Sequence, residues 1–229
     1  MKKRFAVVVF MCCTIAWLSL SLSVIGSDNE HYRYLQRIDS EHADVDWLLE
    51  KGERTRLVYR KNSPQNSELS VTTIDKGYAT VSWELSVPDE HTEVKAVRRG
   101  NAIHLVGTVN GRPVDKLFKI DSAPWFQAMS VCLRAMVFSN ASKMEFWILR
   151  PDTLKPHKLI AKKQGVDTMP VLGEPAEVQQ ITIGLPGMLA PFWSATYWFK
   201  KEDGVFVKYE GPHGPPGSPM VMVNLVGVM

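Results

Sequence analysis

The feature of this sequence that most constrains its fold is a long series of short β-rich runs, separated by turn signals, that begins near Leu57. The turn signals include Asn62-Ser63-Pro64, Asp75-Lys76-Gly77 and Gly100-Asn101. Asn110-Gly111 is the strongest of them, because both residues tolerate the positive φ of a tight hairpin. The series predicts an antiparallel meander. Its predicted strands are the runs TRLVYR, SELSVTTID, YATVSWELSV, TEVKAVRR, AIHLVGTVN and RPVDKLFKI.

One segment interrupts the β pattern, between Ser122 and Asn140. Ser122 is a possible N-cap and Pro124 suits the first turn of a helix. The apolar residues that follow, Trp125, Met129, Leu133 and Met136, recur at the spacing of one helix face. The segment therefore predicts an amphipathic helix.

Strands are predicted again after the helix, in the runs KMEFWILR, KPHKLIAKKQ, EVQQITIGL, WSATYWFKK, VFVKYEG and MVMVNLV. Strands, then one helix, then strands indicate a mainly β (α+β) fold, in which a long curved antiparallel sheet or unclosed barrel wraps around one central amphipathic helix. Residues 55–229 are expected to form this single domain. Residues 27–54 are highly charged, with Tyr32, Leu35 and Ile38 at helix-like spacing, and predict a partly helical N-terminal arm.

The first 26 residues have the pattern of a secretory signal peptide. Lys2, Lys3 and Arg4 precede an uncharged stretch from Phe5 to Gly26. The stretch is also about long enough to cross a bilayer, so an uncleaved anchor is the alternative interpretation. We expect a periplasmic protein, attached to the inner membrane if the segment is not cut.

Charge and cysteine content support this compartment and exclude one class of partner. Removing the leader lowers the number of Lys and Arg residues from 27 to 24, equal to the 24 Asp and Glu. A neutral chain without a basic cluster does not predict nucleic-acid binding. Cys132 is the one cysteine beyond the leader, so no internal disulfide is possible, and its place on the apolar helix face predicts a buried small hydrophobe.

No catalytic, metal or cofactor signature is found, and we expect a protein that is not an enzyme. The histidines are scattered, without metal-ligand spacing or a cysteine partner. Asp89-Glu90-His91 with Glu93 follows Pro88 and is interpreted as a solvated turn. There is no GxSxG elbow and no glycine-rich phosphate loop.

The hairpin WSATYWFKKEDGVFVKYEG carries large rings on both faces of its strands. Two interpretations remain open. In the first, one set of rings fills the core while Trp198 and Phe206 pair on the outer face. In the second, one set lines a groove for an apolar ligand, together with the methionine-bearing helix. The candidate lining residues are Trp125, Met129, Met136, Phe146, Trp193, Tyr197 and Phe199.

The segments KLFKIDSAPW, GLPGMLAPFWSATYWFKKEDGVFVKYEG and GPPGSP, in this order, resemble bacterial periplasmic proteins of unknown function with a lipoprotein-carrier-like (LolA-like, LppX-like) half-barrel. The resemblance covers roughly residues 57–226. It implies an unclosed antiparallel barrel around a helix, with a hydrophobic interior that accepts acyl chains. It defines no site residues, and the chain departs from the pattern in lacking a lipid anchor.

Two functional hypotheses follow. The first is a non-enzymatic periplasmic carrier or sensor of a hydrophobic ligand, either a lipid or a lipidated protein. The alternative is an envelope interaction or assembly protein with a filled core, which contacts a protein partner through a sheet edge or through the Pro-rich loop 211–219.

Overall fold

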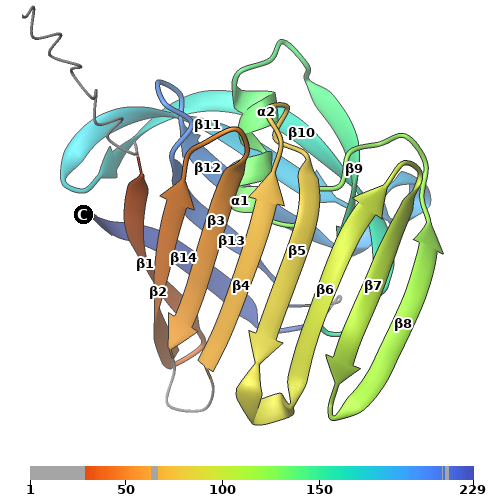
Figure 1. Cartoon of the computed structure of the whole chain (residues 1–229). Helices are drawn as coiled ribbons and strands as arrows, with labels where there is room; N and C mark the ends of the chain where they lie inside the picture. Colours follow the sequence, from red (N-terminus) through yellow and green to blue (C-terminus); the bar gives the residue numbers. More distant parts are fainter. Residues whose placement is uncertain (1–28, 63–66, 213, 215–216) are drawn as a thin grey trace, which may run out of the picture.

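The fold is one large antiparallel sheet. The structure is a computed structural model, and it describes residues 29–62, 67–212, 214 and 217–229. These residues form a 14-stranded sheet that curls on itself (Figure 1). Its strands are β1 Glu30–Ile38, β2 Glu41–Glu50, β3 Thr55–Asn62, β4 Ser67–Ile74, β5 Thr80–Val87, β6 Thr92–Arg99, β7 Ala102–Val109, β8 Arg112–Lys119, β9 Lys143–Leu149, β10 Pro156–Val171, β11 Glu174–Gly184, β12 Ser194–Lys200, β13 Phe206–Pro212 and β14 Met220–Val228.

The strand order is a double meander. Strands β1 to β8 pair in sequence, β9 to β14 do the same, and β1 joins the two series by pairing with β14. Strands β8 and β9 are the two edges, and they are not paired with each other in the described part of the chain. The predicted mainly β fold with an unclosed sheet around a helix is confirmed, and we call this curled, open sheet the half-barrel.

The prediction of a helical N-terminal arm is wrong. The described part of this segment forms β1 and β2. The two strands pair along their length, from Glu30 opposite Leu49 to Ile38 opposite Glu41. In β1 the buried positions are Tyr32, Tyr34 and Gln36, which is a period of two. The apolar spacing of Tyr32, Leu35 and Ile38 had hidden this alternation. The arm therefore supplies two central strands of the half-barrel.

The predicted long helix is much shorter in the structure. It consists of two consecutive four-residue pieces, α1 Met129–Cys132 and α2 Arg134–Val137. Trp125 lies outside both, because its segment is extended: Phe126 N–H donates to Trp147 O (2.8 Å) and Trp125 O accepts from Thr80 N–H (2.7 Å). The short helix is still the centre of the core, since Cys132, Leu133 and Met136 are fully buried.

Two short 3₁₀ helices lie in loops, η1 at Pro88–Glu90 and η2 at Gly187–Phe192. Among the residues that the structure describes, no helix has the length and apolar character of a membrane span. The predicted leader, residues 1–26, lies outside the described residues.

Candidate functional site: an interior cavity

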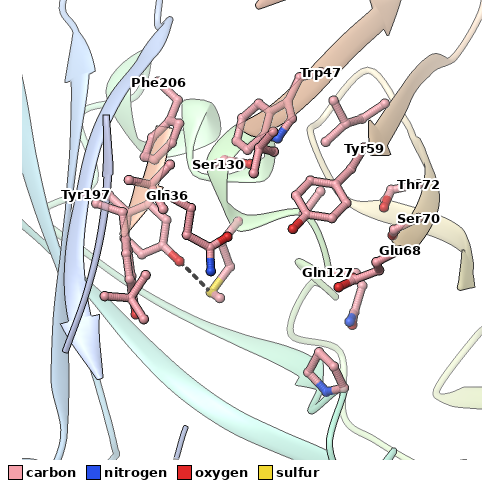
Figure 2. A pocket seen from close by; sticks show the side chains of 18 of the residues that line it. Gln36, Trp47, Tyr59, Glu68, Ser70, Thr72, Gln127, Ser130, Tyr197 and Phe206 are labelled. Atoms are coloured by element: carbon pink, nitrogen blue, oxygen red, sulfur yellow. Dashed lines mark hydrogen bonds between the residues drawn. The ribbon is translucent and has the colours of Figure 1, made fainter. Parts of the chain in front are cut away.

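A cavity of about 340 Å³ lies inside the half-barrel. Its walls come from β1–β5 on one side and β12–β14 on the other, and the start of α1 covers it (Figure 2). Ligand pockets in proteins are commonly about 300 to 1,000 Å³. The lining residues are Gln36, Val45, Trp47, Leu57, Tyr59, Glu68, Ser70, Thr72, Trp83, Gln127, Ala128, Met129, Ser130, Pro151, Tyr197, Phe206, Tyr209, Pro212, Val221 and Val223.

One wall of the cavity is polar because β4 turns polar side chains toward the interior, whereas an ordinary half-buried strand turns its apolar side chains inward. Its Glu68, Ser70 and Thr72 line the cavity, while Leu69 lies on the outer face and is 39% exposed. The pairing fixes this orientation, since Thr72 lies opposite Leu57 of β3 and opposite Trp83 of β5. Short polar side chains leave space where aliphatic ones would fill a core. The cavity therefore exists partly because β4 turns its polar face inward.

The opposite wall is aromatic. Trp47 of β2 stacks on Phe206 of β13 with ring centroids 5.2 Å apart. Tyr34 donates its hydroxyl hydrogen to Phe206 O (3.0 Å), and Tyr197 meets Tyr209 edge to face at 4.9 Å. The contacts of Trp47 and Tyr34 with Phe206 connect β2 and β1 of one half of the sheet to β13 of the other. The cavity thus has one wall of rigid rings and one of small polar groups.

The polar groups of the lining differ in their hydrogen bonding. Trp83 Nε1 donates to Ser70 Oγ (2.8 Å) within the polar wall. Tyr197 donates its hydroxyl hydrogen to Met129 Sδ (3.8 Å). Trp47 Nε1 is buried and has no hydrogen-bond partner among the described residues. In Figure 2 the nitrogen-bearing edge of this indole is turned toward the space between Gln36 and Tyr59.

Burial also sets the ionisation of the lining. It raises the pKa of Glu68 above its ordinary value, which nearby Lys61 opposes and the charge of Glu90 reinforces. It also raises the pKa of Tyr59, so this phenol stays neutral. Of the described residues that line the cavity, none is Lys, Arg or His.

The predicted lining residues divide into two groups. Met129 and Tyr197 line the cavity. The other five do not. Trp193 is partly buried, with its Nε1 donating to Gly214 O (2.8 Å). The remaining four belong to the packed core, where their rings and chains are fully buried: Trp125, Met136, Phe146 and Phe199. They face inward as predicted, but neighbours fill the space around them.

Sequence reasoning missed most of the lining. Gln36 and Trp47 come from the segment interpreted as a helical arm. Glu68 was not singled out, because its run SELSVTTID was interpreted only as one of the predicted strands. The available signal was the run of alternate polar residues in SELSVTTI, which is the inner face of β4.

The predicted outer pair of Trp198 and Phe206 is wrong. The β12–β13 ladder shifts register after Trp198, so Trp198 lies opposite Lys208 and Phe199 opposite Phe206. The extra residue of this bulge lets both Phe206 and Val207 be buried. On the outer face, Trp198 instead holds the Lys208 ammonium 4.9 Å from its ring centroid.

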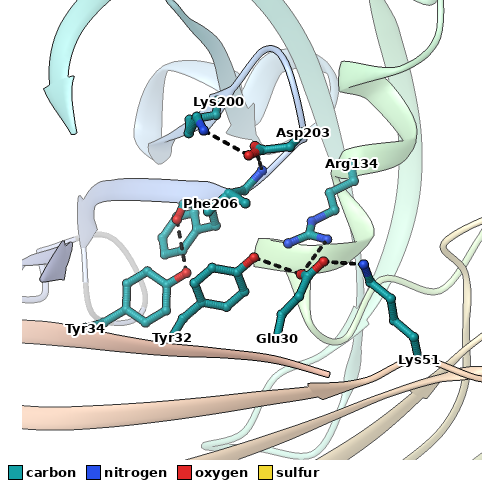
Figure 3. A network of polar contacts seen from close by, with 9 residues as sticks. Glu30, Tyr32, Tyr34, Lys51, Arg134, Lys200, Asp203 and Phe206 are labelled. Carbon is teal, nitrogen blue, oxygen red and sulfur yellow. Dashed lines mark hydrogen bonds and ion pairs between the residues drawn. The ribbon is translucent and has the colours of Figure 1, made fainter. Parts of the chain in front are cut away.

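A second polar cluster surrounds Glu30 at the start of β1, and its charged residues are not part of the cavity lining (Figure 3). The Glu30 carboxylate contacts Arg134 (3.5 Å) and Lys51 and accepts a hydrogen bond from the Tyr32 hydroxyl (2.8 Å). Burial opposes ionisation of Glu30, but the hydrogen bonds from Lys51 and Tyr32 and the charge of Arg134 outweigh it and lower its pKa. The cluster ties α2 to β1 and β2, which is a structural role.

Reactive and metal-binding groups are few. Cys132 is fully buried and free, as predicted, and burial raises its pKa to about 12. Within the described residues no group of three or more His, Cys, Asp or Glu side chains could hold a metal ion. His104 Nε2 lies 2.8 Å from Asp115 Oδ1 at the surface.

Comparisons with known proteins support the fold. No family model matches the chain, and no curated protein matches its sequence. It is similar in structure to a beta-barrel-like protein of domain of unknown function DUF1849 from Brucella abortus, with a TM-score of 0.58 and 9% identity over 87% of this chain and 96% of that one. The hypothetical lipoprotein YmcC from Escherichia coli aligns with a TM-score of 0.35 and 8% identity over 86% of this chain and 84% of that one. The similarity to the Brucella protein is a similarity of fold, and it supports the unclosed β-barrel architecture.

Proposed function

We propose that this protein is a non-enzymatic binding protein for a hydrophobic ligand, a lipid or the acyl chain of a lipidated protein, which it carries or senses outside the cytoplasm. The observation that carries the proposal is the 340 Å³ cavity inside the half-barrel. The signal-like leader supports the compartment. We also propose that the chain is related to the lipoprotein-carrier half-barrels that its sequence resembles.

The walls of the cavity suit an apolar guest. Val45, Leu57, Val221 and Val223 offer aliphatic surface, and the stacked Trp47 and Phe206 offer a rigid flat one. Burying apolar surface contributes roughly 25 cal/mol per Å². Pockets of this kind combine mostly apolar walls with a few polar groups that fix orientation.

The test is to fill the cavity without touching its polar groups. Val223→Phe inserts a ring into the space, whereas Val226→Phe makes the same change on the same strand β14 at a position that is 41% exposed and outside the lining. We expect native mass spectrometry to detect co-purified lipid with the wild type and Val226→Phe, and about tenfold less with Val223→Phe. Absence of lipid from the wild type, with no binding of added apolar dye, would contradict the proposal.

A second candidate function is an envelope interaction protein, and an exposed apolar loop favours it. In η2 the side chains of Met188, Leu189 and Phe192 are 93%, 56% and 66% exposed. Contiguous exposed apolar side chains of this size mark interaction sites. The residue signal was present in GLPGMLAPFW, but sequence reasoning assigned the contact to a sheet edge or to the Pro-rich loop instead.

The sheet edge named from the sequence is less suited to a partner. The edge strand β8 exposes Leu117, but Pro113, Lys116 and Lys119 lie on the same strand and disfavour strand addition. The Pro-rich loop 211–219 stays a prediction, since His213, Pro215 and Pro216 lie outside the described residues. We assign the contact surface of this second candidate to η2, because its apolar side chains are exposed.

A further inference from the structure

We infer that the cavity selects amphiphiles with an uncharged, hydrogen-bond-accepting head group, such as the ester and hydroxyls of a monoacylglycerol, over free fatty acids. This inference rests on the proposed function and specifies its ligand class. The group that carries it is the indole N–H of Trp47.

Trp47 is exceptional among the tryptophans of the interior. Trp83 Nε1 donates to Ser70 Oγ, Trp125 Nε1 to Gln127 Oε1 (2.9 Å), and Trp147 Nε1 to Asp121 Oδ1 (2.8 Å). Trp47 is only 7% exposed, lines the cavity, and leaves its Nε1 without a partner among the described residues. A buried donor without an acceptor is destabilising, and a ligand oxygen would relieve that cost.

Other polar groups surround the same space. Gln36 is a buried amide of the lining, and Ser130 is a buried hydroxyl at the start of α1. Tyr59 adds a phenol that burial keeps neutral. All three can both donate and accept hydrogen bonds. They match a head group that presents carbonyl and hydroxyl oxygens.

The charges of the lining argue against an anionic head group. Glu68 is the one ionisable carboxyl among the described lining residues, and none of them is a cation. A buried charge is costly unless it is both hydrogen-bonded and paired with an opposite charge, and the lining supplies donors but no cation. A cationic head group would in turn leave the Trp47 donor without an acceptor. The uncharged head group is the class that satisfies both observations.

The aliphatic part of the ligand has a separate place. Val221 and Val223 of β14 and Val45 and Leu57 of the neighbouring strands line the cavity beside the rings of Trp47 and Phe206. The acyl chain lies against this surface, and the head group lies toward Trp47 and the polar face of β4. The arrangement orients an amphiphile rather than merely enclosing it.

The experiment compares three probes on the delipidated wild-type protein at pH 8: 1-monolauroylglycerol, laurate and the hydrocarbon dye diphenylhexatriene. We expect the glyceride to bind about tenfold or more tightly than laurate, a difference of about 1.4 kcal/mol. The difference should shrink at acid pH, where laurate becomes uncharged. The dye should bind without dependence on pH.

Matched variants locate the contact. Trp47→Phe removes the free donor and keeps a ring, and should weaken glyceride binding about three- to tenfold without changing dye binding. Trp147→Phe removes a donor that Asp121 already satisfies, at a residue outside the cavity lining, and should leave the ratio of glyceride to dye affinity unchanged. Laurate binding as tight as glyceride binding at pH 8 in the wild type overturns the head-group inference even if a variant fails to fold. Failure of all three probes to bind overturns the proposed function itself.

Discussion

The indole ring of Trp47 on β2 lies nearly parallel to the phenyl ring of Phe206 on β13, at an interplanar angle of 15°. The two strands are separated in the sheet by β1 and β14, so the stack crosses the interior of the half-barrel. Tyr34 adds its own ring 4.3 Å from Trp47 and 5.3 Å from Phe206. This three-ring cluster holds the curvature of the sheet, and its Trp47 and Phe206 belong to the aromatic wall of the cavity.

Replacing Phe206 should therefore be costly. We expect Phe206→Ala to lower the free energy of unfolding by about 3–5 kcal/mol, because it removes a buried ring and leaves space beside Tyr34 and Trp47. Urea unfolding followed by tryptophan fluorescence measures this change. Phe192→Ala, at a 66% exposed position, serves as the control and should shift the value by no more than about 0.5 kcal/mol. Equal effects of the two substitutions would refute the role of the ring cluster.

The close approach of β6 and β7 depends on a glycine. Gly107 has φ of +139°, and a Cβ there would lie 2.2 Å from the Glu93 backbone oxygen. We expect Gly107→Ala to destabilise the protein by at least about 2 kcal/mol, because backbone atoms cannot move aside as a side chain could. Gly165→Ala is the matched control, since a Cβ there meets nothing within 4 Å. Thermal unfolding of both variants tests the difference.

The apolar loop η2 should contribute to association and not to folding. Because Met188, Leu189 and Phe192 are exposed, we expect their combined replacement by Ser to leave the unfolding free energy nearly unchanged. The same variant should elute earlier from a hydrophobic-interaction column and lose any stoichiometric cross-link to a partner. Ligand binding in the cavity should persist. A large loss of stability would show that the loop packs on the body of the protein.

Asp121 should titrate far below an ordinary aspartate. Hydrogen bonds from Lys158, Trp147 and the Ala123 backbone lower its pKa from 3.8 to about 2. Its stabilising contribution is therefore present above the unfolded value and is lost as the pH falls toward 2. Carboxyl NMR should place the midpoint near 2 in the wild type and closer to 3.8 in Lys158→Met. A wild-type midpoint near 3.8 would mean that the ion pair does not persist in solution.

The sheet was predictable from the sequence because its signals are local. The Asn110-Gly111 turn forms a two-residue hairpin, with Val109 opposite Arg112, and Asn110 has the expected positive φ of 48°. The helical face of Leu133 and Met136 is buried as its spacing indicates. The helix was overextended toward Trp125 because hydrogen bonds to distant Thr80 and Trp147 hold that part of the chain extended.

The cavity was not predictable in the same way, because it depends on which residues remain unfilled in three dimensions. Phe146 and Phe199 face the interior as predicted, yet both are fully packed. The space instead lies beside Glu68 and Thr72, where the inner face of β4 is polar. A one-residue bulge after Trp198 reversed the expected side of Phe206, and nothing in the sequence marks that bulge.

The pairing of β1 with β14 has a consequence for biosynthesis. Tyr32 lies opposite Val228, so the ladder that unites the two meanders links residues near opposite ends of the described chain. In a nascent chain that still lacks β14, the two meanders cannot pair with each other. Their unpaired edge strands then favour aggregation. The pairing that unites the two meanders therefore forms only after β14 has been synthesised.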